Sequence, residues 1–83
     1  IQMFTESACI LFLRDGSLNL RVKIGAKCGF FGLPDCIVSV SGVKYQLKRQ
    51  SLQLGIFESI ANEFTAEDVR CDVRGDCLVT YEI

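Results

Sequence analysis

Hydrophobic and polar residues alternate in several short stretches of the chain, and these stretches predict β-strands. Residues 18–24 alternate strictly, with apolar side chains on one face and polar side chains on the other, which is the period of a half-buried strand. Residues 8–13 before them are continuously apolar and lead to Asp15-Gly16, a dipeptide favoured in two-residue hairpin turns. We therefore predict an antiparallel hairpin over residues 8–24. Its inward-facing residues are Leu18, Leu20, Val22 and Ile24.

Two later segments show the same alternation on both sides of a glycine. Residues 36–48 alternate around Ser41-Gly42, and residues 68–83 alternate around Gly75-Asp76, so each segment is predicted to be a hairpin. Residues 25–35 contain three glycines and a proline, and we expect them to form an irregular surface loop. The residues predicted to face inward are Val38, Val40, Val43, Tyr45, Leu47, Val69, Cys71 and Val73.

The hydrophobic period changes after Ser51, which is a suitable N-cap for a helix. Apolar residues now recur every four positions, which is typical of an amphipathic helix with one buried face. The predicted fold class is α+β: an antiparallel β-sheet or small OB-like barrel, in the order β-β-β-β-α-β-β, with one packed helix. The apolar stripe of that helix consists of Leu52, Ile56, Phe57, Ile60, Ala61 and Phe64.

Length and charge limit the classes of protein to consider. The 83 residues predict a single domain over residues 1–83, which buries only about 60–65% of the surface of the unfolded chain. Basic and acidic residues almost cancel, to a formal charge of -1, so we expect no nucleic-acid partner. No apolar run approaches the roughly 18 residues that span a bilayer, so we expect no transmembrane segment.

Five cysteines are the main anomaly in the composition. Two disulfides and one free thiol would stabilise a core that is too small to hold alone, and disulfides indicate a secreted or extracellular protein. The alternative is a cytoplasmic protein whose reduced cysteines are buried as small apolar residues. The spacing offers no paired ligands for zinc, so no metal site is expected. The disulfide candidates are Cys9, Cys28, Cys36, Cys71 and Cys77.

Catalytic chemistry has little support in the sequence. The chain has no histidine, so it cannot form a Ser-His or Cys-His nucleophile pair. Its glycines match neither the dinucleotide fingerprint nor the phosphate-binding P-loop. We therefore expect no enzyme activity and no cofactor.

The tripeptide Arg74-Gly75-Asp76 lies between Cys71 and Cys77. This segment resembles the Arg-Gly-Asp ligands of integrins, in which a cystine loop holds the tripeptide at its apex. The resemblance implies that Arg74 would meet carboxylates of the receptor and that Asp76 would complete the coordination of a divalent metal. The alternative is that Gly75-Asp76 is only the turn of the last hairpin.

A second candidate contact is the pair Phe30 and Phe31 in the glycine-rich segment between Cys28 and Cys36. Two adjacent phenylalanines on a loop are hard to bury together, and an exposed apolar tip indicates a partner. The alternative is that one of them covers an open end of the sheet. The predicted order of elements is also similar to that of the B subunits of bacterial toxins, which have an OB-fold and form oligomers that bind cell-surface glycans.

These observations predict a small secreted or exported binding module of the toxin-subunit, effector or adhesion type. It would recognise a cell-surface protein receptor or glycan through its cysteine-bracketed loops, which carry the candidate contacts. Three alternatives stay open: an integrin-type ligand, a cytosolic small-molecule-binding or regulatory domain with reduced cysteines, and one chain of a larger assembly. The last includes a homo-oligomer, or a partner chain bound through the odd cysteine.

Overall fold

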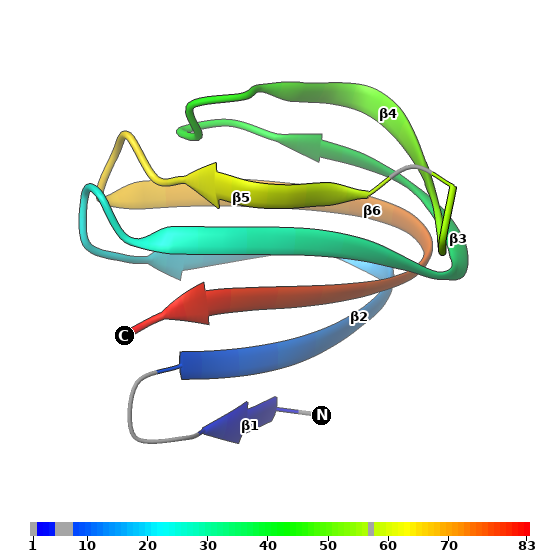
Figure 1. Cartoon of the computed structure of the whole chain (residues 1–83), viewed down its shortest axis with the longest axis horizontal. Coiled ribbons are helices and arrows are strands. Elements are labelled where there is room, and N and C mark those ends of the chain that lie inside the picture. The colour runs from blue at the N-terminus through cyan, green and yellow to red at the C-terminus, as the bar shows by residue number, and fades with distance from the viewer. Residues whose placement is uncertain (1, 5–7, 57) are drawn as a thin grey trace.

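The computed structural model describes residues 2–4, 8–56 and 58–83, and every regular element in these ranges is a β-strand (Figure 1). All strand pairs are antiparallel, in the order β1-β2-β6-β3-β4, and β5 pairs with β3. The strands are β1 (Gln2–Phe4), β2 (Ala8–Arg21), β3 (Lys27–Val40), β4 (Leu47–Gln53), β5 (Ser59–Glu63) and β6 (Asp68–Glu82).

The sheet folds over to form a β-sandwich, because β2, β3 and β6 are long enough to run through both layers. Figure 1 shows these three strands curving at the same end of the molecule. The apolar side chains between the layers form one core cluster. The first layer contains residues 8–14, 76–82 and 27–32, with β1 and β5 at its edges. The second layer contains residues 16–21, 68–74 and 36–40, with β4 at its edge.

The bends occur at the residues that predicted turns. Asp15 has a φ of 42° and Gly75 a φ of 90°, and the register of β2 against β6 shifts between Arg14 and Gly16. The hairpin turns predicted at Asp15-Gly16 and at Gly75-Asp76 are therefore wrong, because each strand continues through its bend. A bulge needs the same left-handed backbone as a tight turn, so the same residues serve both.

The surface loop predicted over residues 25–35 is also wrong, since β3 runs through most of it. β3 pairs with β5 on one side and with β6 on the other. The bend of β3 falls between Gly32 and Cys36, where its register against β6 shifts. Phe30 is fully buried in the core, so this segment supplies interior packing.

No helix is found among the described residues, and the helix predicted after Ser51 is wrong. Leu52 is buried in β4 and Phe64 is buried beyond the end of β5, whereas Ile56 between them is 79% exposed. Gly55 has a φ of 77°, and its N–H donates to the Glu58 carboxylate at 2.7 Å. The apolar residues that recur every four positions after Ser51 therefore belong to a strand, a turn and a second strand rather than to one helix. Phe57 lies outside the described residues, as does the side chain of Ile60.

Most of the alternating segments lie in strands with the expected buried faces, but the strand predicted over residues 43–48 is wrong, because residues 41–46 form the connection between β3 and β4. Leu20 and Val22, then Val38 and Val40, then Val69, Cys71 and Val73 are all buried. Two inward assignments are wrong: Ile24 is 64% exposed and Tyr45 is 58% exposed. Both residues lie in connections between strands, where the backbone no longer follows the pleat of the sheet.

None of the five cysteines forms a disulfide, and all of them are buried. Cys9, Cys28 and Cys77 point into the core from the first layer, and Cys36 and Cys71 from the second. The prediction of disulfide stabilisation is therefore wrong. These side chains fill the interior as small apolar residues, which is a common role of buried cysteine.

Candidate functional site

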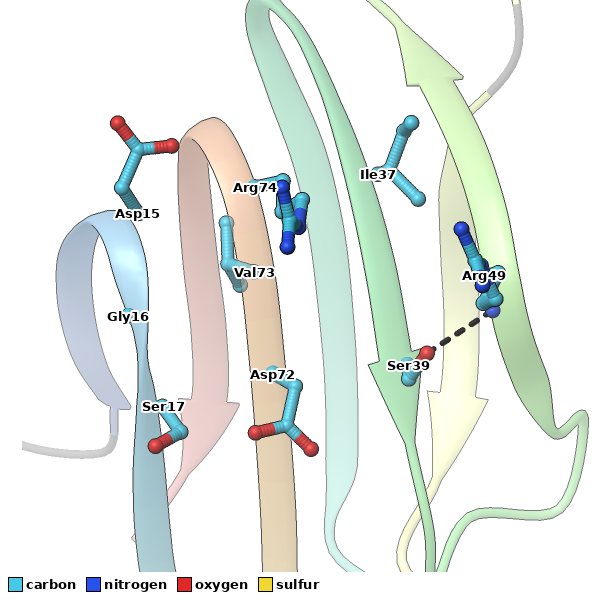
Figure 2. A pocket seen from close by; sticks show the side chains of 9 residues that line it. All are labelled: Asp15, Gly16, Ser17, Ile37, Ser39, Arg49, Asp72, Val73 and Arg74. Atoms are coloured by element: carbon cyan, nitrogen blue, oxygen red, sulfur yellow. Dashed lines mark hydrogen bonds between the residues drawn. The ribbon is translucent and has the colours of Figure 1, made fainter.

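A cavity of about 550 Å³ lies on the outer face of the second layer. We call it the outer cavity. Figure 2 shows that its side chains come from four strands, β2, β6, β3 and β4. Its volume falls within the roughly 300–1,000 Å³ of small-molecule sites. Its lining residues are Asp15, Gly16, Ser17, Ile37, Ser39, Arg49, Asp72, Val73 and Arg74.

The side chains of two irregular positions line opposite sides of the outer cavity. Asp15, at the bend of β2, stands opposite two residues of β6. Arg49, on β4, shares with Lys48 a bulge opposite Ser39. Arg49 has a φ of 48°, and its N–H donates to the Ser39 hydroxyl at 2.9 Å (Figure 2). The two outer strands of this sheet face, β2 and β4, are therefore both irregular where they border the outer cavity.

The acidic side chains of the outer cavity have partners within the fold, but its two arginine side chains form no ion pair with the described residues. Asp72 forms an ion pair with Arg70 at 3.2 Å, and the Asp15 carboxylate accepts the Gly75 N–H at 2.7 Å. Arg49 and Arg74 form no ion pair with any described residue. The carboxylates therefore have partners within the fold, whereas the two guanidinium groups remain available.

A second, shallower opening of about 220 Å³ lies on the first layer, where β3, β5 and β6 meet. We call it the β5 opening. Gly29 lies within it, and a Cβ at that position would come within 3.1 Å of the Phe31 ring and 3.2 Å of the Thr80 hydroxyl. Ala61 has a φ of 58°, which is uncommon for a residue with a Cβ and is frequent at ligand sites. The β5 opening is lined by Ala8, Lys27, Cys28, Gly29, Phe31, Ala61, Thr80, Tyr81 and Glu82.

Acidic groups surround the single lysine of the β5 opening. The Lys27 ammonium donates to the Glu63 carboxylate at 2.8 Å, and this hydrogen bond holds the pKa of Glu63 below its usual value. The Lys27 N–H donates to the Glu82 carboxylate at 2.6 Å. Burial, together with a hydrogen bond to Cys9, raises the pKa of Tyr81 to about 12. Tyr81 is therefore a neutral phenol, and its ring packs edge-on against Phe64, with ring centroids 5.9 Å apart.

The structure separates the residues that were predicted to bind a partner. Arg74, Gly75 and Asp76 lie inside β6 rather than at a loop apex, and Asp76 forms an ion pair with Arg14 at 2.6 Å. Phe30 is buried in the core. Phe31 is half-buried and lines the β5 opening. Of the five residues, Arg74 lines the outer cavity and Phe31 the β5 opening, so the two lie at different sites.

Asn62 is a buried polar residue that sequence reasoning missed. It is fully buried, and its side chain makes four hydrogen bonds: two with the Tyr45 backbone, one from the Glu63 N–H and one to the Ser59 hydroxyl. These contacts fasten the segment around Tyr45 to β5. A lone asparagine beside a glutamate gave no sequence signal for this role.

The described ranges contain neither a metal site nor a membrane-spanning helix. No group of three His, Cys, Asp or Glu residues in residues 2–4, 8–56 and 58–83 is placed to hold a metal ion. Over the same ranges, no helix is long and apolar enough to cross a bilayer.

Comparison with solved structures identifies close matches to the fold. The thiamin pyrophosphokinase from Candida albicans superposes with a TM-score of 0.85 and 19% identity over 99% of this chain and 32% of that one. The thiamine pyrophosphokinase from Bacillus subtilis gives a TM-score of 0.82 and 17% identity over 98% of this chain and 39% of that one. The chain thus spans about a third to two fifths of the length of these relatives. No curated protein matches it.

Residues 17–78 match the family described as the vitamin B1 binding domain of thiamin pyrophosphokinase. The secreted toxin-like or adhesion module is therefore a wrong prediction, as are its disulfides and its binding of a cell-surface receptor. The small-molecule-binding alternative agrees with the match. The prediction of no enzyme activity conflicts with a family that is named for an enzyme, although the matched part is its binding domain. The chain belongs to the family of thiamin pyrophosphokinase vitamin B1 binding domains.

Proposed function

We propose that this chain binds thiamin as the substrate-binding domain of a pyrophosphokinase, in a cytosolic protein whose cysteines stay reduced. The observation that carries the proposal is the family match over residues 17–78, three quarters of the 83 residues. The five buried cysteines, none of which forms a disulfide, support the cytosolic assignment, because disulfides are rare in that compartment. The chemistry of diphosphate transfer is assigned to the part of the relatives that this chain does not cover.

The β5 opening suits the chemistry of thiamin better than the outer cavity does. Thiamin joins an aminopyrimidine ring to a positively charged thiazolium ring. The β5 opening offers the half-buried Phe31 ring for stacking. Its exposed Glu82 carboxylate can form an ion pair with a cationic ring. The outer cavity instead presents Arg49 and Arg74 without acidic partners, and these guanidinium groups would repel a cation.

Titration of the chain with thiamin, followed by calorimetry, tests this assignment. Phe31→Leu keeps an apolar side chain but removes the aromatic face, and Glu82→Gln keeps the shape but removes the charge. We expect each change to weaken thiamin binding by about threefold to tenfold. Arg74→Gln, in the outer cavity, is the matched control and should leave thiamin binding unchanged. Equal affinity for the parent chain and both β5-opening variants would exclude this location.

We propose that a second copy of this chain packs against the outer face of the first layer. Phe12, Leu78 and Phe31 form a row across β2, β6 and β3, and all three are only half-buried. An apolar row of this kind is uncommon on a fully solvated face. The homo-oligomer is one of the alternatives that the sequence leaves open and stays a prediction, and sedimentation of the chain with and without Phe12→Ser would test it.

A further inference from the structure

We propose that the outer cavity is a second binding site, which takes an organic phosphate through Arg49 and Arg74. This site is separate from the β5 opening and does not depend on the proposed binding of thiamin. Arg49 comes from β4 and Arg74 from β6, and Figure 2 shows Ile37 of β3 between them. Two guanidinium groups on either side of one strand form a binding surface for an anion, because each presents a planar fork of donors that matches phosphate oxygens.

The pairing of the neighbouring carboxylates makes the site selective for anions. Asp72 is paired with Arg70, and Asp76 is paired with Arg14. Asp15 accepts the Gly75 N–H. None of these three carboxylates forms an ion pair with Arg49 or Arg74. The positive charge at this end of the cavity is therefore left for a ligand to neutralise.

The backbone at Arg49 supports a role in binding rather than in folding alone. Its φ of 48° is in the left-handed region, which glycine or asparagine adopts more easily than arginine. The Ser39 hydroxyl accepts its N–H and holds this conformation. Strained backbone of this kind is concentrated at ligand sites, where the surrounding structure maintains it.

The rest of the cavity fits the organic part of such a ligand. Ile37 is 43% exposed and offers an apolar surface beside the two guanidinium groups. Ser17 of β2 and Asp72 of β6 also line the cavity (Figure 2) and supply a hydroxyl and a carboxylate that can bond to ligand hydroxyl groups. A volume of about 550 Å³ is larger than a bare phosphate needs. A nucleotide or a sugar phosphate therefore fits better than inorganic phosphate.

Calorimetric titration of the chain tests the proposal, with adenosine diphosphate, inorganic pyrophosphate and adenosine as three separate probes. We expect adenosine diphosphate to bind more tightly than pyrophosphate, and adenosine not to bind. Arg74→Gln and Arg49→Gln should each lower the affinity for adenosine diphosphate and for pyrophosphate by at least about tenfold. Arg49→Gly should lose binding to the same degree while folding stably, because glycine suits the positive φ.

Arg21→Gln is the control, because Arg21 is an exposed arginine of β2 outside the cavity. It should leave the affinity for both phosphate probes unchanged. Equal losses in Arg21→Gln and Arg74→Gln would overturn the proposal, since they would show unspecific attraction to charge. Unchanged affinity in Arg49→Gly would overturn it as well, and so would the absence of binding by the parent chain at millimolar probe. Thiamin affinity should be the same in all four variants. A failure of the phosphate site in the outer cavity is therefore distinguishable from a failure of the thiamin site in the β5 opening.

Discussion

The N–H of Gly75 donates a 2.7 Å hydrogen bond to the side chain of Asp15, and this contact joins the bend of β6 to the bend of β2. Beside it, Arg14 pairs with Asp76 at 2.6 Å. Both strands cross from one layer of the sandwich to the other at this point. The contact explains why the two strands bend at the same level, and it places Asp15 at the edge of the outer cavity.

Gly75→Ala should destabilise the fold strongly. A Cβ at this position would lie 2.9 Å from the Asp35 carbonyl oxygen, and φ is 90°. We expect the free energy of unfolding, measured by urea denaturation, to fall by about 2–4 kcal/mol. Gly25→Ala is the matched control, because its φ is also positive, at 91°, but no atom lies within 4 Å; it should cost about 1 kcal/mol. If the two variants lost the same free energy of unfolding, close packing around Gly75 would not contribute to stability.

Asn62→Ala should cost about 2–4 kcal/mol of stability, because it removes four hydrogen bonds from a fully buried site. Asn19→Ala is the same change at an exposed position of β2 and should cost less than about 0.5 kcal/mol. Chemical denaturation of both variants provides the comparison. If the two variants were equally stable, Asn62 would not be the fastening point between β5 and the segment around Tyr45.

Stability should fall in alkaline solution because the thiols are buried in the protonated form. Burial raises the pKa of Cys71 from 9.0 to about 11, and that of Cys28 to about 12. The unfolded chain loses these protons first, so the stabilisation is complete below pH 9 and is lost as the pH rises from 9 toward these folded-state values. At about pH 10, Cys71 alone should account for a loss of about 1 kcal/mol.

The control for this pH effect is Cys71→Val, which keeps a small apolar side chain without a titrating group. Urea denaturation at several pH values, with reductant present, should give a shallower alkaline decline for this variant than for the parent chain. Parallel declines in the two proteins would contradict the assignment to Cys71.

Thiol counting tests the redox state on which the cytosolic assignment depends. A thiol reagent should find five reactive groups in the unfolded protein, since none of the five cysteines forms a disulfide. In the folded protein the reaction should be slow, because every thiol is buried away from the reagent. A count of one in the unfolded protein would instead show two disulfides.

The sequence predicted stretches of β2, β3 and β6 but not how far these strands extend, and it assigned the region of β5 to a helix. Alternation located the buried faces around Leu20, Val38 and Val69, because a sheet face repeats every two residues. It failed at Asp15 and Gly75, since left-handed backbone is equally suited to a tight turn and to a bend in a continuing strand. Only the partner strand distinguishes the two cases, and that partner is distant in sequence.

The candidate sites were less predictable than the fold. Arg74 and Phe31 were named, but as parts of loops that do not exist; each lies on a long strand at the edge of a different opening. Arg49 gave no signal, because its importance comes from a bulge opposite Ser39. The apolar spacing after Ser51 was read as a helix, although Ile56 in the middle of that stripe is exposed.

NMR chemical shifts can map directly where thiamin binds on the chain. We predict saturable shifts of the backbone amides of Gly29, Phe31, Ala61 and Thr80, which lie around the β5 opening. The amides of Ser39 and Arg74, in the outer cavity, should stay unchanged. Saturable shifts confined to the outer cavity, or no shifts at millimolar thiamin, would contradict the proposed role of this domain.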